Sequence, residues 1–372
     1  MLTEEALLAL PDSIQQHFHQ LERDLIAIIV EHIKEIGTVS SEDTRRLDEL
    51  RRIGFNIEKI EKKVAEAVEL GHEEVIRILN YSAQNEYGDA ERLAHIAPNR
   101  PVLSGFNENE FIRVLVESIA NITSNSFRNI SNLSAIGFSD GSGKVQSLGN
   151  FYQQAIDYAI LQARTGQQDF TTSVSSIVRN MADRGLRQLF WESGYSQRLD
   201  TAVRREIFGG LAALSQQQSE WVHREVGADG YEITWHSGFR PTHDFGGLQF
   251  TDSQFYGTIK PLMEEPNCYH RSFAIIMGLS TPAYSREELQ ALNREDARER
   301  GYEGNTFTRY EAQQHQRKLE TAIRKAHDRV HAFKVLDDIV TTRIERTRAR
   351  LLEQEYNKFN TAMGLPPRRG FL

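Results

Sequence analysis

Residues 308–340 read TRYEAQQHQRKLETAIRKAHDRVHAFKVLDDIV, and they carry the strongest pattern in this chain of 372 residues. Thr308 and Glu311 have the spacing of a capping box, in which two side chains three positions apart satisfy free backbone N–H groups at a helix start. Apolar residues then recur in alternating steps of four and three, at Leu319, Ile323, Ala326, Val330 and Phe333. This heptad spacing predicts a long helix with one apolar seam.

The seam loses its strict phase after Phe333 but continues loosely through Leu336, Val340, Ile344 and Leu351. An unbroken helix from Arg309 to Phe359 would be on the order of 75 Å long. Such a helix needs a partner for its seam, and either a hairpin within the chain or a neighbouring subunit can supply one. We therefore predict a C-terminal long-helix region over residues 285–372, with self-association through that helix as one of two arrangements.

Two earlier regions also show helical spacing. Apolar residues recur on one face between Ile57 and Val68, and again between Phe111 and Ile119. A similar pattern resumes at Phe151 and continues to about residue 225. Stripes of this kind are usually the core faces of amphipathic helices. We predict a mainly α fold with an N-terminal helical region, 1–130, and a second helical region, 151–225.

Residues 131–150 separate these regions and are rich in Ser, Asn and Gly. They contain GFSDGSGKV, from Gly137 to Val145. A phosphate-binding P-loop needs four residues between its first glycine and its Gly-Lys pair, followed by Ser or Thr. Here five residues lie between Gly137 and Gly143, and Val145 follows Lys144. The stretch is predicted to be a flexible connection and no nucleotide site.

The composition changes again over residues 226–284. Aromatic and β-branched residues from Tyr231 to Trp235 predict a strand, and residues 248–250 predict a second short one. Glycine and proline punctuate the loops between them. Ser285 and Glu288 then form another capping box. We predict a small α+β, loop-rich module at 226–284.

This module holds the side chains best suited to chemistry, in WHSGFRPTHDFGGLQF (235–250) and EEPNCYHRSF (264–273). His236, His243, Cys268 and His270 are suitable zinc ligands in type and number, although their spacing matches no standard zinc finger. The alternative is that the histidines bind loop backbone and the cysteine is structural. Arg240, next to Pro241, could contact an anion or anchor a loop carboxylate.

A further alternative is an enzyme, a hydrolase or transferase in which Cys268 is the nucleophile and His236 or His243 the base. No G-x-S-x-G, H-E-x-x-H or dinucleotide-binding signature supports an enzyme. The formal charge of −8 argues against a protein that wraps nucleic acid. One cysteine excludes an intrachain disulfide, and the longest strongly apolar run, Leu25 to Val30, is too short for a membrane span.

Several of these motifs occur together in a known family. The residues concerned are His236, Gly238, Arg240, Pro241, His243, Gly247, Asn267, Cys268, His270, Gly278, Ser280, Pro282, Ala283, Tyr284 and Ser285. TRYEA at 308–312, which includes Tyr310 and Glu311, is followed by QRK at 316–318. RLDTAVRR at 198–205 and AMGL at 362–365 complete the set. The combination resembles the phage minor capsid protein 2 family, which is similar in outline to Mu-type head-morphogenesis proteins.

The resemblance implies a low-copy structural protein of the virion, bound to the portal or the capsid interior. It implies a part in head assembly, genome packaging or ejection, and residence in the host cytoplasm during assembly. Its partners would be the portal, other head proteins and, in a DNA-associated ejection protein, the packaged DNA, with no membrane. It implies no chemical activity. Family members often carry Cys-Gly shortly before Asn-Cys, where this chain has Met263 to Pro266, and this departure weakens the zinc prediction.

Overall fold

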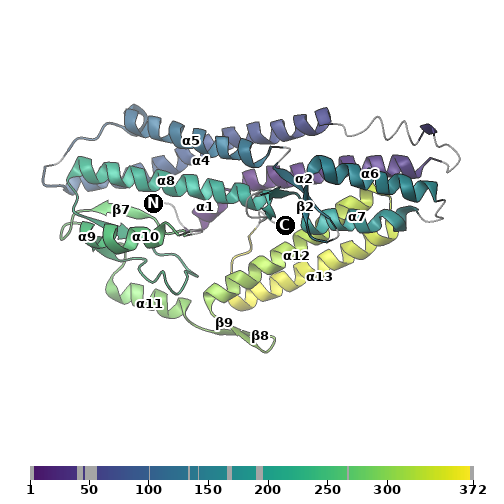
Figure 1. The fold of residues 1–372 in the computed structure, drawn as a ribbon. Helices are drawn as coiled ribbons and strands as arrows, with labels where there is room; N and C mark the ends of the chain where they lie inside the picture. Colours follow the sequence, from purple (N-terminus) through teal and green to yellow (C-terminus); the bar gives the residue numbers. More distant parts are fainter. Residues whose placement is uncertain are drawn as a thin grey trace.

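The computed structural model describes residues 4–39, 45–46, 57–99, 101–132, 135–140, 142–165, 170–189, 196–265 and 268–368. These form an elongated, mainly helical molecule (Figure 1). Two helices, α4 and α5, run along one edge, and α8 and α2 lie below them. The small module lies under α8 at one end, and the C-terminal helices lie under α2 and α7 at the other. The mainly α fold is as predicted.

The helices of the first two regions bury one continuous apolar core. They are α1 (Glu4–Ala9), α2 (Asp12–Gly37), α4 (Ile57–Ile96), the short η1 (Phe106–Glu108), α5 (Glu110–Ile130), α6 (Leu148–Arg164), α7 (Phe170–Arg184) and α8 (Leu199–Val226). Phe18 of α2 meets Phe127 of α5 edge to face, with ring centroids 5.8 Å apart. Both rings are fully buried, so their contact helps to hold α5 against α2. No helix in the described ranges is long and apolar enough to span a bilayer.

A four-stranded antiparallel sheet interrupts the helices, in the order β2-β1-β3-β4. Its strands are β1 (Ile136–Ser139), β2 (Val145–Ser147), β3 (Arg187–Leu189) and β4 (Ser196–Arg198). The sequence predicts a flexible connection at 131–150 and a helical region at 151–225; the structure has β1 and β2 in the first range, and β3 and β4 between the helices of the second. Ile136 and Phe138 are buried, which explains why the first hairpin is anchored. Gly137 is required because a Cβ there would lie 1.7 Å from the Gln146 carbonyl oxygen.

The C-terminal region is a helical hairpin of α12 (Arg309–Val335) and α13 (Ile339–Met363). The helical region from Arg309 to Phe359 is therefore not one unbroken helix, and of the two arrangements left open for its seam the hairpin within the chain is present. Asp337 takes a left-handed conformation, with φ of 62°, which breaks the helix. Asp338 then caps α13 by accepting a hydrogen bond from the Thr341 N–H at 2.9 Å. The α13 helix folds back along α12 (Figure 1).

The small module is built on a three-stranded sheet in the order β6-β5-β7. Its elements are β5 (Gly230–Ile233), β6 (Gln249–Thr251), α9 (Asp252–Gln254), η2 (Phe255–Ile259), α10 (Lys260–Met263) and β7 (Ser272–Ile275). After it come α11 (Arg286–Asp296) and a hairpin of β8 (Arg300–Tyr302) and β9 (Asn305–Phe307). Both predicted capping boxes are confirmed, at Ser285 and Thr308. Arg271 ties the module to α4 through a buried ion pair with Glu86.

Candidate functional site

The four predicted zinc ligands come together at one end of the small module. We call His236, His243, Cys268 and His270 the histidine–cysteine cluster. β5 and β7 pair antiparallel, with Ile233 opposite Ser272. This register places the loop after β5, which carries the first two histidines, against the segment before β7, which carries the other two residues. The sheet topology therefore gathers residues that are 25 to 34 positions apart in the sequence.

The rings and the thiol of the histidine–cysteine cluster are in contact. The His236 and His270 ring centroids lie 4.3 Å apart, and those of His243 and His270 lie 5.8 Å apart. The Cys268 Sγ atom is 3.5 Å from His270 Nδ1. In the part of the chain that the structure describes, no three donor atoms of this cluster lie within 4.8 Å of one another. A metal would therefore require side-chain rotations to draw the donors around it.

Two histidines of the cluster differ in how they are held. His243 Nε2 lies 3.2 Å from the Leu262 carbonyl oxygen, and its Nδ1 lies 3.0 Å from Thr242 Oγ1. His243 is thus held by a carbonyl of α10 and by the hydroxyl of its neighbour in the loop. His270 is 4% exposed, and its Nε2 atom has no hydrogen-bond partner among the described residues. A buried polar atom without a partner is costly, so His270 is the member of the cluster with capacity for a ligand.

Burial favours the neutral forms of three cluster members, His236, Cys268 and His270. It is the main reason that the pKa of His270 falls to about 2, with smaller contributions from His236, His243 and Arg240. Burial also lowers the pKa of His236 and raises the pKa of the Cys268 thiol. A cysteine nucleophile reacts as the thiolate, which a neighbouring imidazolium stabilises. These shifts oppose that ion pair, and the histidine beside Cys268 is His270 rather than His236 or His243.

The cluster lines a cleft of about 1730 Å³, whose other walls come from α1, α4, the start of α12 and residues 365–368. Arg240 donates a hydrogen bond of 2.9 Å to Glu265, so it anchors a loop carboxylate. Pro241 is exposed. Gly247 has φ of 79°, and a Cβ there would lie 2.7 Å from Leu289 Cδ1, so this position requires glycine. Asn267 lies outside the described residues.

The loop that carries His236 is held by Arg309 of the TRYEA motif and by two residues that the sequence analysis did not single out, Asp296 and Gln313. The Asp296 carboxylate accepts hydrogen bonds from Ser237 Oγ at 2.7 Å and from the Gly238 N–H at 2.9 Å. Arg309 Nε donates to Ser237 Oγ at 3.0 Å, and Gln313 donates to the Ser237 carbonyl at 3.2 Å. The only available signal was the position of Asp296 at the end of a helix with a clear start.

The TRYEA motif therefore joins α12 to the small module. Its Arg309 reaches Ser237 on one side and the Gly364 carbonyl, at 2.8 Å, on the other. Tyr310 lines the cleft, and Glu311 completes the capping box with Thr308. The motif thus has a structural explanation in helix initiation and docking.

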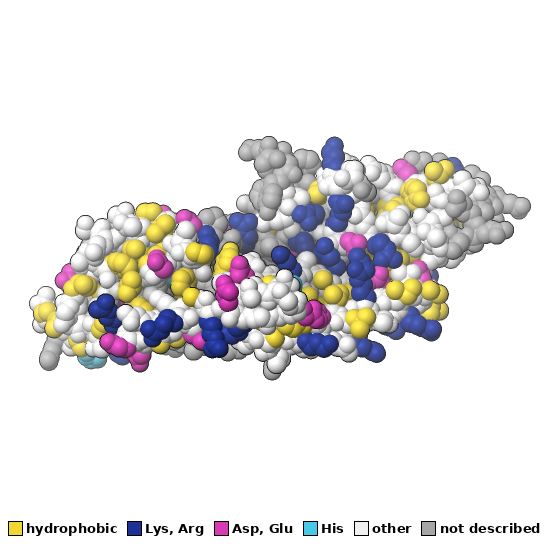
Figure 2. All heavy atoms as spheres, turned by 90° about the horizontal axis from the view of Figure 1, so that it is seen from below, with side chains coloured by type: hydrophobic (Ala, Val, Ile, Leu, Met, Phe, Trp, Pro, Cys, Tyr) yellow, Lys and Arg dark blue, Asp and Glu magenta, His cyan; other side chains and the backbone are white. Residues whose placement is uncertain are grey.

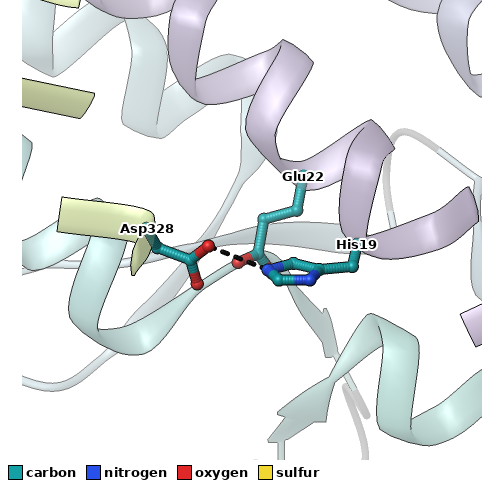
Figure 3. A group of neighbouring side chains, drawn as sticks. All are labelled: His19, Glu22 and Asp328. Atoms are coloured by element: carbon teal, nitrogen blue, oxygen red, sulfur yellow. Dashed lines mark hydrogen bonds and ion pairs between the residues drawn. The ribbon is translucent and has the colours of Figure 1, made fainter. Parts of the chain in front are cut away.

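A second buried polar group lies where α2, β4, α8 and α12 meet. We call it the ion network, and it consists of His19, Glu22, Arg198, Asp200, Arg324 and Asp328. Arg198 contacts Glu22 and lies 3.3 Å from Asp328 Oδ2. Arg324 pairs with Asp200. His19 Nε2 lies 2.8 Å from Asp328 Oδ1, and Figure 3 shows these two residues together with Glu22.

Three members of the ion network are of a type that binds metals. His19, Glu22 and Asp328 offer donor atoms within 4.8 Å of one another (Figure 3). Arg198, however, already bridges the two carboxylates with its guanidinium, and a second cation would be repelled there. Burial alone would raise the pKa of Asp328, but the hydrogen bond from His19 and the charges of His19 and Arg198 outweigh it and hold that pKa well below its ordinary value. His19, Glu22 and Asp328 are therefore members of the ion network rather than ligands of a metal.

Comparison with known proteins gives one match. A family model described as phage minor capsid protein 2 matches residues 2–246 and 248–360. No curated protein and no solved structure matches the chain. The matched ranges include every described helix and strand from α1 to α12, and all but the last three residues of α13.

Proposed function

Because this chain belongs to the phage minor capsid protein 2 family, and is thus a structural protein of the phage head, we propose that it is a low-copy component that docks on the portal or the capsid interior. There it acts in head assembly, genome packaging or ejection. The observation that carries this proposal is the family match over nearly the whole chain, which includes both the helical layers and the small module. Its partners are the portal and other head proteins, in the host cytoplasm during assembly and then in the virion.

The way the parts are joined supports a docking role. The ion network connects α2 and α8 to α12, and Arg271 connects the small module to Glu86 of α4. These buried links make the helical layers, the module and the C-terminal hairpin one elongated body. Such a body presents several faces to neighbours at fixed spacing. The formal charge of −8 disfavours wrapping the genome as its main task.

Quantitative mass spectrometry of purified mature particles and of empty proheads tests this proposal. We expect a small, fixed number of copies in both, because a protein that docks on a symmetric ring is limited by the number of ring sites. Absence from both particles would overturn the structural role in the head. Presence in proheads alone would make the protein an assembly factor and would overturn the roles in packaging and ejection.

We further propose that the histidine–cysteine cluster binds a structural zinc ion. The support is the 3.5 Å between Cys268 Sγ and His270 Nδ1, a separation that two ligands of a tetrahedral zinc would have. The small module has a thin core of its own and would gain much from a metal. Zinc analysis of the purified chain tests this, with Cys268→Ser and His270→Ala expected to abolish zinc binding. A metal-free wild-type chain that ignores added zinc would overturn it.

A further inference from the structure

The α13 helix carries apolar residues on two opposite sides. The inner side packs within the molecule through Ala349, Tyr356, Phe359 and Met363, which are all buried. The outer side, which we call the outer seam, consists of Val340, Ile344, Thr347 and Leu351. Its three large apolar members are 71%, 59% and 60% exposed. A helix with apolar residues on opposite sides is typical of a helix that is covered on both.

The outer seam has the spacing of a coiled coil. Its members follow one another in steps of four, three and four, which places Ile344 and Leu351 at a positions and Val340 and Thr347 at d positions of a heptad. Arg343 and Arg350 then fall at g positions, and Arg348 falls at an e position. These are the positions that flank a seam and select its partner by charge.

The charge around the outer seam is strongly positive. Arg343, Arg346, Arg348 and Arg350 are all exposed. From residue 339 to 352 the single acidic residue is Glu345, which is buried and paired with Arg179 and Arg329. The hairpin from residue 309 to 363 has twelve Lys and Arg and eight Asp and Glu, a formal charge of +4, within a chain of −8. Figure 2 shows the lower face of the molecule, where Lys and Arg side chains are interspersed with hydrophobic ones.

We propose that the outer seam binds an acidic amphipathic helix that carries carboxylates beside its own apolar seam. The inference that this helix belongs to another protein of the phage head rests on the proposed function. The inference that the helix is acidic rests only on the arginines around the outer seam. A second copy of the same seam is excluded as the partner, because Arg343, Arg348 and Arg350 would face one another, and like charges at these positions oppose pairing.

The seam also favours a protein over DNA. Exposed Val340, Ile344 and Leu351 bury no surface against a phosphate backbone, whereas an apolar centre with arginines is the usual composition of a protein interface. Four arginines and no lysine lie between residues 339 and 352. The planar guanidinium binds carboxylates with two parallel hydrogen bonds, which a lysine cannot do.

Two synthetic helical peptides, each about three heptads long, test the proposal. Both have Ile and Leu at a and d positions; one has Glu and the other Lys at e and g positions. We expect the purified full-length chain to bind the acidic peptide about tenfold more tightly than the basic one in fluorescence anisotropy, since three flanking charge pairs change sign. Equal binding of both peptides, or binding of neither, would overturn the proposal.

Variants locate the binding surface. Arg343→Glu, Arg348→Glu and Arg350→Glu together should reverse the preference between the peptides, and Ile344→Asp alone should weaken binding of both. The matched control is Arg77→Glu, Arg92→Glu and Arg113→Glu, which changes the net charge equally at exposed positions of α4 and α5 and should leave the preference unchanged. If a short DNA duplex competes with the acidic peptide at equal affinity, the seam is a DNA site and the proposal fails.

A photo-crosslinking residue in place of Thr347, which is exposed, extends the test to purified particles. We expect crosslinks to an acidic helical segment of another head protein, and crosslinks to a second copy or to DNA would overturn the proposal. If the chain is absent from particles but still prefers the acidic peptide, the proposed function fails while the acidic-helix specificity stands. If the chain is present in particles but binds both peptides equally, the acidic-helix specificity fails while the proposed function stands.

Discussion

The ion network and the histidine–cysteine cluster are both buried and polar, yet the cost of burying their polar groups is offset in opposite ways. In the ion network, Arg198 and Arg324 neutralise the carboxylates of Glu22, Asp200 and Asp328. In the histidine–cysteine cluster burial holds His236, Cys268 and His270 neutral, and His270 Nε2 has no hydrogen-bond partner among the described residues. The proximity of the donor atoms alone would point to a metal at His19, Glu22 and Asp328. Charge and free donor atoms point instead to the neutral cluster.

Removal of Arg198 should have the largest effect on the stability of the ion network. The change Arg198→Met leaves Glu22 and Asp328 buried without their shared counter-charge, and a single broken buried pair typically costs about 3–5 kcal/mol. We expect a loss of that size in the free energy of unfolding, measured by urea denaturation and circular dichroism.

Arg205→Met is the matched control for Arg198→Met. Arg205 belongs to the same RLDTAVRR motif but is exposed and donates to Gln197, so we expect a change within about 0.5 kcal/mol. Equal effects of the two substitutions would contradict the assignment of Arg198 to a buried ion network. Zinc content should be the same in both variants, because neither residue touches the histidine–cysteine cluster.

The second prediction concerns ligand binding, which should distinguish the two clusters. If zinc binds the histidine–cysteine cluster, a free zinc concentration of 100 times Kd should stabilise the chain by about 2.7 kcal/mol. The gain in Tm should appear in wild type and in Arg205→Met, and should disappear in His270→Ala. A zinc-dependent gain that survives His270→Ala but is lost in His19→Ala would move the metal to the ion network and reverse the comparison.

The third prediction uses pH to probe the ion network. Asp200 and Asp328 have pKa values below the ordinary range in the folded chain, although burial acts to raise both. The charges of Arg324 and Arg198 outweigh burial at Asp200. His19 and Arg198 outweigh it at Asp328. A depressed carboxyl pKa contributes stability that is present above the unfolded value, about 3.9, and is lost as pH falls below it. We expect the free energy of unfolding to fall by about 1 kcal/mol or more per pH unit below pH 4.

Asp328→Asn provides the test of this pH dependence. The variant is less stable at neutral pH, but it has one fewer carboxylate to protonate, so its stability should fall less steeply between pH 4 and pH 2. An identical slope in wild type and Asp328→Asn would show that Asp328 does not carry the acid sensitivity.

The two clusters also show what can be predicted from the sequence and what cannot. Signals within a few residues were reliable: the capping boxes at Ser285 and Thr308 and the strand that begins near Tyr231 are all present. The sequence placed the four residues of the histidine–cysteine cluster in one small module, but their gathering depends on the pairing of β5 with β7, a strand that was not predicted. The only sequence signal for the break at Asp337 was the loss of heptad phase after Phe333. This signal is weak, because it is compatible with a hairpin and with one long helix.

Features that depend on distant segments could not be predicted. Arg198 meets Glu22 across 176 positions and Asp328 across 130 positions of the chain, and no local pattern relates them. The hairpin at 136–147 looked like a linker because glycine and serine dominate its turn, yet β1 gains its partner, β3, from residues 187–189. The only local indication of the ion network was that charged residues such as Glu22 fall on otherwise apolar helix faces.

The smallest predicted effect concerns Asp140, a carboxylate with a lowered pKa outside either cluster. Hydrogen bonds from Ser142 and Gln146, with smaller contributions from the Lys144 and Ser142 backbone, lower its pKa to about 2. These donors are neutral and the turn faces solvent, so water replaces much of what a substitution removes. We expect Asp140→Asn to cost about 0.5 kcal/mol at neutral pH, against no change for Glu91→Gln, an exposed control on α4. A loss near that of Arg198→Met would mean that a lowered carboxyl pKa, rather than burial beside a fixed counter-charge, determines stability in this fold, and the contrast between the two clusters would lose its physical basis.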